Sequence, residues 1–133
     1  MIERLLIAII LVAVGAAAYH LLTQRQLGRA NQHAPADPLL ADAPSGRPVI
    51  VYFTTPTCAP CRLQQTPTLQ RLQQELGERL HVVRVDATQQ PDAAQRWGVF
   101  SVPTTFVLDQ HGRARGVHNG IVDSETLKRE LLA

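Results

Sequence analysis

Residues 49–62 of this 133-residue chain read VIVYFTTPTCAPCR and place two cysteines soon after an apolar run. The first five residues are β-branched, aromatic or aliphatic without a break, which is typical of a central strand buried on both faces. After the cysteines, Leu69, Leu72 and Leu76 recur at helical spacing, and Gly77 is a suitable stop. The sequence therefore predicts a buried strand, a CxxC motif and an amphipathic helix in immediate succession.

Cys58 and Cys61 are the only cysteines in the chain. A small fold stapled by disulfides uses several pairs at wider spacing. A structural zinc site needs four nitrogen or sulfur ligands, and the five histidines do not fall at zinc-finger spacing. We therefore expect no metal site and interpret the pair as a redox motif.

The place of the motif at the start of a helix gives each cysteine a role. Unpaired backbone N–H groups and the helix dipole favour a thiolate at the first position. Cys58 is the expected nucleophile, and Cys61, one turn further into the helix, is the expected resolving thiol. Pro60 suits the first helical turn and stiffens the loop. We expect no cofactor other than the redox-active Cys58–Cys61 disulfide.

Strand and helix patterns alternate through the rest of the chain. Further strands are predicted at residues 81–87, 104–109 and 114–118, and further helices at residues 91–97 and from Asp123 onward. A right-handed crossover makes the first two strands parallel, and a turn at residues 111–112 makes the last two antiparallel. The predicted fold class is α/β, in the order βαβαββα, with a mixed four-stranded sheet flanked by helices. Trp97, the only tryptophan, is expected in the core.

Residues 5–22 read LLIAIILVAVGAAAYHLL and contain no Asp, Glu, Lys or Arg. As a helix, this stretch is just long enough to cross a hydrocarbon core of about 30 Å. We interpret residues 1–22 as an N-terminal transmembrane anchor. Two alternatives are a cleavable signal peptide, with the alanines at 16–18 as its cleavage site, and a buried helix of a soluble protein.

The basic residues around this stretch bear on its orientation. Arg25 and Arg29 follow it, whereas Arg4 precedes it. Counting Lys and Arg alone, the rule that cytoplasmic flanks are positive favours a cytoplasmic domain by two to one. The positive charge of the amino terminus lies on the same side as Arg4 and reduces this difference. An extracytoplasmic domain is the alternative.

Residues 23–48 differ in composition from both neighbours, being rich in Gln, Ala and Pro without a persistent helical or strand period. They predict a Pro/Ala-rich linker that holds a domain at residues 49–133 away from the bilayer. The formal net charge is only +2, and the 13 basic residues are dispersed along the chain. We therefore expect no nucleic-acid partner.

Four separated segments of the chain resemble the thioredoxin family: VIVYFTTPTCAPCR, VVRVDAT, WGVFSVPTTFVLDQHGR and NGIVDSETLKREL. The resemblance covers residues from 49 to the C-terminal region and implies a thioredoxin-like fold with thiol–disulfide oxidoreductase activity. It also implies that Pro103 is cis beside the CxxC and that the Val102 backbone pairs with an extended substrate segment. Gly120 resembles the glycine that lines the family's substrate groove, although it also suits a simple turn. With Pro60, these are the expected substrate-binding residues.

The chain also departs from the family pattern around the cysteines. Thr57 stands where the family usually has a tryptophan, Tyr52 where it often has a buried acid, and Val82 where it often has a base. Pro67 falls one residue later than usual, and no strand and helix are predicted before Val49. These departures leave the proton path and the substrate open.

We expect a reductase of disulfide-containing proteins, re-reduced by an upstream reductase or a membrane electron donor. Pro60 between the cysteines resembles the reductase members of the family. A non-catalytic module that binds extended peptides is the alternative from another functional class. A third hypothesis is metal or iron–sulfur binding through the CxxC motifs of two chains.

Overall fold

In the computed structural model, which describes residues 1–132, four strands form one mixed sheet in the order β2-β1-β3-β4. The strands are β1 (Val49–Thr54), β2 (His81–Asp86), β3 (Thr104–Leu108) and β4 (Ala114–Asn119). β1 pairs in parallel with β2, and the β1–β3 and β3–β4 pairs are antiparallel. The predicted order βαβαββα and the thioredoxin-like sheet are confirmed. The predicted domain ends at Ala133, which lies outside the described residues.

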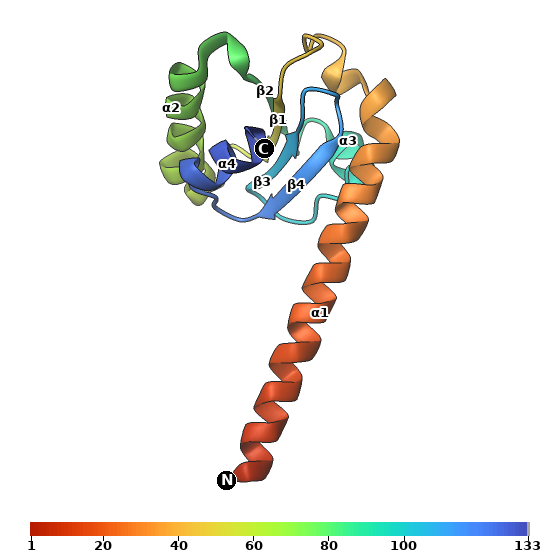
Figure 1. Ribbon diagram of the computed structural model, residues 1–133, viewed down its shortest axis with the longest axis vertical. Helices are drawn as coiled ribbons and strands as arrows, with labels where there is room; N and C mark the ends of the chain where they lie inside the picture. The colour runs from red at the N-terminus through yellow and green to blue at the C-terminus, as the bar shows by residue number, and fades with distance from the viewer. Residues whose placement is uncertain (133) are drawn as a thin grey trace.

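Helices cover both faces of the sheet, which is why every residue of β1 is buried. Ile50 and Tyr52 pack in one cluster with leucines of α2 (Thr66–Leu76) and α4 (Ser124–Leu131). Val51 and Phe53 pack in the other cluster with Trp97, which follows α3 (Pro91–Arg96). Figure 1 shows α2 and α4 on one side of the sheet, and α3 with the upper part of α1 on the other.

The structure differs from the sequence prediction at residues 23–48. One helix, α1 (Ile2–His33), runs on past the apolar stretch, and two 3-10 turns follow it at Ala34–Ala36 and Pro38–Leu40. The predicted linker is therefore folded, and a helix does precede β1. Glutamine, arginine, leucine and alanine are good helix formers, so the helix continues easily. Its buried face, which includes Gln26 and Ala30, packs on the sheet and is mostly polar or small.

Asp37 fastens this N-terminal segment to the domain. Its carboxylate is fully buried and accepts hydrogen bonds from Arg96 Nε and Nη2 at 3.1 Å, from Trp97 Nε1 at 2.8 Å and from the Leu39 N–H at 3.0 Å. Burial alone would raise the pKa of Asp37, but these hydrogen bonds and the Arg96 charge outweigh it and hold the pKa below its ordinary value. Asp37 is therefore a buried carboxylate that stays ionised.

Replacing Asp37 with asparagine is expected to lower the free energy of unfolding by about 2–4 kcal/mol at neutral pH, because the donors around it lose their charged acceptor. A lowered native pKa stabilises the fold above the unfolded value of about 3.9, and this contribution is lost as the pH falls through the native pKa. The difference in stability between the two proteins, measured by denaturant titration, should therefore begin to shrink as the pH falls below about 4 and should vanish only below the native pKa of Asp37. Asp42→Asn, at an exposed position of the same segment, is the control and should change little.

The N-terminal part of α1 stands clear of the domain (Figure 1) and exposes its large apolar side chains to the surroundings. An 18-residue window of this helix has a mean hydropathy of 2.5 and no buried residues. By length and composition the helix can serve as a membrane anchor or as a signal sequence.

Candidate active site

The two cysteines lie at the carboxyl end of β1, where the chain turns toward α2. The Cys58 N–H donates to the Thr55 carbonyl oxygen at 3.2 Å, which closes the turn after the strand. Cys58 and Cys61 form a disulfide with their Cα atoms 5.3 Å apart. Cys58 is 9% exposed and Cys61 only 1%, so an incoming group reaches Cys58 first.

The backbone around the pair favours negative charge on Cys58. The Cys61 N–H donates to Cys58 Sγ at 3.2 Å, as expected where a cysteine precedes the first helical turn. Such an N–H stabilises a thiolate more than a thiol and so favours ionisation of the sulfur after reduction. The geometry is consistent with attack by Cys58 and resolution by Cys61, and those roles remain predictions.

A π-helical turn, Cys61–Gln65, joins the cysteines to α2. The Thr66 N–H donates to the Cys61 carbonyl oxygen, five residues back, so the turn holds one residue more than an α-helical turn. This extra residue accounts for the late position of Pro67, which still lies in the first turn of α2. The offset proline was the only sign of the π-turn in the sequence.

The π-turn buries Gln65, a residue that sequence reasoning missed. Its amide forms two hydrogen bonds with the backbone of Val122: Nε2 donates to the carbonyl oxygen at 3.1 Å, and Oε1 accepts from the N–H at 2.8 Å. Gln65 thus ties the helix that carries the cysteines to the loop that follows Gly120. No local sequence pattern predicts this contact, because Gln65 and Val122 are 57 residues apart in the chain.

Gln65→Leu is expected to lower the free energy of unfolding by about 1–3 kcal/mol, because it leaves two buried backbone groups of Val122 without partners. Gln64→Leu is the matched control, since Gln64 is exposed and adjacent. Urea unfolding followed by circular dichroism measures both variants. Equal stability of the two would contradict the role given to the Gln65 amide.

The loop before β3 lies at the same end of the sheet as the cysteines. The Val102–Pro103 peptide bond is cis, as the resemblance implied, and Val102 packs against the cluster that contains both cysteines. The Gly120 N–H donates to the Pro103 carbonyl oxygen at 2.8 Å. Gly120 has a φ of 129°, which favours glycine and suits both a groove wall and a turn. Pro60 is exposed between the cysteines.

Tyr52 occupies the position where the resemblance led us to look for a buried acid. Its hydroxyl is 3.4 Å from the Cys61 carbonyl oxygen and 3.1 Å from Thr66 Oγ1. Tyr52 and Val82 line a small pocket of about 180 Å³ beside α2. Among the buried side chains of residues 1–132, none on this face of the sheet is a carboxylate. The family's acid is therefore replaced by a hydroxyl that binds the backbone of Cys61.

Within the described residues, no three His, Cys, Asp or Glu side chains are grouped so that they could hold a metal ion. Around the two sulfur atoms, the hydrogen-bonding groups are the Cys61 N–H and, at the Cys61 carbonyl oxygen, the Tyr52 hydroxyl. The arrangement suits thiol–disulfide exchange through Cys58, the less buried of the two cysteines, and the absence of a cofactor remains a prediction.

Comparisons with known proteins point to one family. The thioredoxin family model matches residues 37–133. Thioredoxin from Bacillus subtilis (strain 168) is 38% identical over 60 residues, which are 45% of this chain and 57% of that protein. Thioredoxin 1 from Synechococcus elongatus is 32% identical over 87 residues, covering 65% of this chain and 79% of the relative. Thus the first of these alignments spans little more than half of the relative.

A similar solved structure is the X-ray structure of Fasciola hepatica thioredoxin. It superposes with a TM-score of 0.57 at 27% identity, over 65% of this chain and 83% of that one. Together with the disulfide at the end of β1, the family match supports thiol–disulfide exchange as the chemistry of this site.

Proposed function

Because the chain belongs to the thioredoxin family, we propose that it is a thiol–disulfide oxidoreductase that reduces protein disulfides at a membrane. The Cys58–Cys61 pair carries this proposal. Cys58 is the less buried of the two residues, and the Cys61 N–H donates to its Sγ. Thiolates stabilised in this way at a helix start are the nucleophiles of disulfide exchange.

The proposed cycle has two exchange steps. The Cys58 thiolate attacks one sulfur of a substrate disulfide, forms a mixed disulfide and releases the other substrate sulfur as a thiolate. The Cys61 thiolate then attacks Cys58 Sγ, which closes the Cys58–Cys61 disulfide and releases the second substrate thiolate. Two electrons pass to the substrate, whose thiolates take up protons from solvent or from Cys61. A dithiol donor, in an upstream reductase or a membrane electron carrier, restores the reduced pair by the reverse exchange.

Tyr52 takes part in the proposed cycle through the backbone. It cannot accept the Cys61 proton as a carboxylate would, but its hydroxyl holds the carbonyl of Cys61 in place. We infer that the proton of Cys61 passes to solvent or to the departing substrate thiolate. This is the point at which the proposed mechanism differs from the one implied by the family resemblance.

Insulin reduction by the full chain in detergent, with dithiothreitol as the donor, tests the activity. The wild type should accelerate insulin precipitation well above dithiothreitol alone, and the double variant Cys58→Ser, Cys61→Ser should match the background. If the wild type reduced insulin no faster than the double variant, the enzyme proposal would be wrong and the peptide-binding alternative would be supported.

We further propose that residues 1–22 anchor the chain in the membrane, with the domain on the cytoplasmic face. The apolar, exposed N-terminal part of α1 supports the anchor. Membranes washed with carbonate should retain the chain. Peptide mapping of the retained chain should find residues 1–18 still attached, rather than a new N-terminus after residue 18. A reporter fused to the C-terminus should be active in the cytoplasm. Activity of an extracytoplasmic reporter would reverse the proposed orientation.

A further inference from the structure

The C-terminal part of α1 runs antiparallel to β4. The side-chain amides of Gln26 and Asn119 exchange two hydrogen bonds, at 2.9 and 2.8 Å, at the end of β4. Asn31 Oδ1 accepts from the Ala114 N–H at 2.8 Å, at the start of the same strand. Followed toward its N-terminus, α1 therefore leaves the domain past the end of β4.

That end of the sheet also carries the cysteines. Phe53, next to last in β1, pairs with Thr104 of β3, which in turn pairs with Asn119. Cys58 follows β1 by four residues, and the Gly120 N–H contacts Pro103. Figure 1 shows the end of β4 and the start of α2 on the side of the domain toward which α1 departs.

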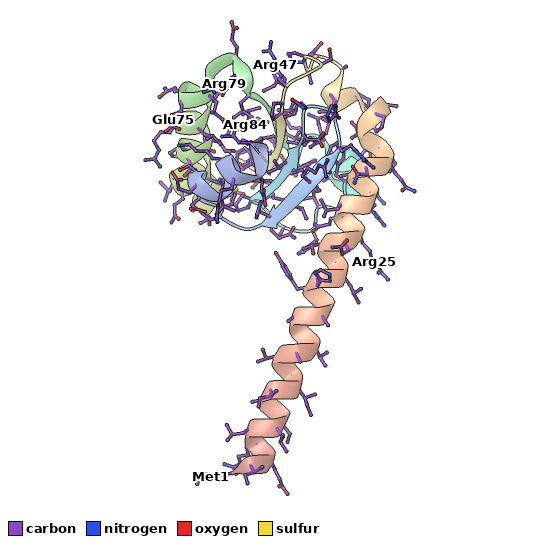
Figure 2. All side chains as sticks on the ribbon, viewed as in Figure 1. Met1, Arg25, Arg47, Glu75, Arg79 and Arg84 are labelled. Atoms are coloured by element: carbon purple, nitrogen blue, oxygen red, sulfur yellow. A yellow bond between two sulfur atoms is a disulfide. The ribbon has the colours of Figure 1, made fainter. Side chains whose placement is uncertain are left out.

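The opposite end of the domain is remote from the exposed helix. Arg47 lies just before the start of β1. In Figure 2, Arg47 and Met1 are labelled at the two extremes of the molecule, with Arg25 where α1 meets the domain. The cysteine end and the Arg47 end of the sheet therefore face in opposite directions along α1.

The connection between the apolar stretch and the domain is short and firmly held. From Leu22 to Gln26 the helix rises about 6 Å. Gln26 Nε2 also donates to the Gly98 carbonyl oxygen at 3.0 Å, and Arg29 Nη1 donates to the Gln95 carbonyl oxygen at 3.1 Å. A Cβ at Gly98, where φ is 71°, would lie 3.3 Å from Arg29, so the helix and this loop are in close contact. Such a helix fixes the direction in which the domain faces.

Large apolar side chains are exposed beside the site. Phe100, two residues before Val102, is 60% exposed, Ile121 next to Gly120 is 49% exposed, and Leu63 in the π-turn is 68% exposed. Each belongs to one of three segments beside the cysteines: the loop before β3, the loop after β4 and the π-turn.

Resting on the proposed activity and anchor, we propose that the Cys58–Cys61 pair faces the bilayer and exchanges with a disulfide of a membrane-embedded protein. With residues 5–22 in the hydrocarbon core, the short exit of α1 holds the cysteine end of the domain against the membrane surface. A disulfide carried close to that surface by a membrane span can reach Cys58. A bulky soluble protein would have to enter between the domain and the bilayer.

Fluorescence quenching tests the orientation with the full chain in phosphatidylcholine vesicles that contain headgroup spin-labelled lipid. A fluorophore is attached to Cys58 in the Cys61→Ser variant and, as the matched control, to Arg47→Cys in a chain with both native cysteines replaced by serine. Quenching at position 58 should be several-fold stronger than at position 47. Equal or weaker quenching at position 58 would overturn the proposed orientation.

A spacer variant tests the partner class. A flexible Gly/Ser spacer of about 12 residues, with a root-mean-square reach of about 20 Å, is inserted between Leu22 and Thr23. Two probes carry the same nitrobenzoate mixed disulfide on a cysteine: a single-span peptide with the cysteine just outside its apolar segment, and a short soluble peptide. In vesicles, the spacer should slow reduction of the single-span probe about tenfold and leave the rate with the soluble peptide unchanged.

The two probes separate failure of this inference from failure of the proposed function. If both chains reduce the soluble peptide and the spacer does not slow the single-span probe, the membrane-facing site is wrong while the oxidoreductase stands. If neither chain reduces either probe faster than the vesicles alone, the oxidoreductase proposal fails and this inference falls with it.

Discussion

Cys61→Ser in the full chain is expected to stop disulfide turnover while leaving Cys58 free to attack, so that a mixed disulfide with the substrate accumulates. Cys58 is the more exposed of the two residues, and its Sγ accepts a hydrogen bond from the Cys61 backbone N–H, which a serine at position 61 retains. Turnover should fall by about 100-fold or more, as when one member of a covalent mechanism is removed. Non-reducing gels and peptide mass mapping with insulin as the substrate measure the adduct.

Cys58→Ser is the matched control for that variant. It should lose turnover to the same extent and should form no adduct, because Cys61 is only 1% exposed and cannot receive an incoming substrate. The assigned order of attack would be contradicted if the Cys58→Ser chain formed as much adduct on Cys61 as the Cys61→Ser chain forms on Cys58.

Trp97→Ala should produce the largest loss of stability among single substitutions, about 3–5 kcal/mol in the free energy of unfolding. The indole is fully buried, its ring centroid lies 5.1 Å from that of Phe106 and 6.2 Å from that of Phe53, and its Nε1–H donates to Asp37 at 2.8 Å. The substitution opens a large cavity and removes one donor from a buried carboxylate. It therefore weakens the contact between the N-terminal segment and the sheet.

Urea unfolding followed by far-ultraviolet circular dichroism measures this loss, because Trp97 is the only tryptophan and its removal abolishes the fluorescence signal. Phe100→Ala is the control, since Phe100 is 60% exposed and should change the free energy of unfolding by less than about 0.5 kcal/mol. A similarly small change for Trp97→Ala would show that the core cluster around Phe53 and Phe106 does not depend on the indole.

The sheet was predictable because its signals are local. Residues 49–53 are apolar without a break, and the turn at residues 111–112 separates the last two strands. These patterns act within a few residues and need no knowledge of distant partners. The cis bond before Pro103 was expected only from the family resemblance, because cis bonds before proline are rare, about 5–6% of such bonds in folded proteins.

The packing of α1 was not predictable in the same way. Its buried face presents an amide and small side chains, Gln26 and Ala30, so residues 23–33 show no apolar stripe. The groups that hold it, such as Asn119, are up to 93 residues away in sequence. Gln65 is similar, because its burial follows from a π-turn and from a partner 57 residues away. Contacts of this kind appear only once the fold is known.

A single-turnover exchange measures the central claim most directly. The full chain is reduced, freed of the reductant and mixed with an excess of insulin in detergent. We expect one insulin disulfide to be lost per chain and the Cys58–Cys61 disulfide to appear in the peptide map. Intact insulin together with a chain that keeps both thiols would contradict the assignment of Cys58 and Cys61 as a catalytic dithiol.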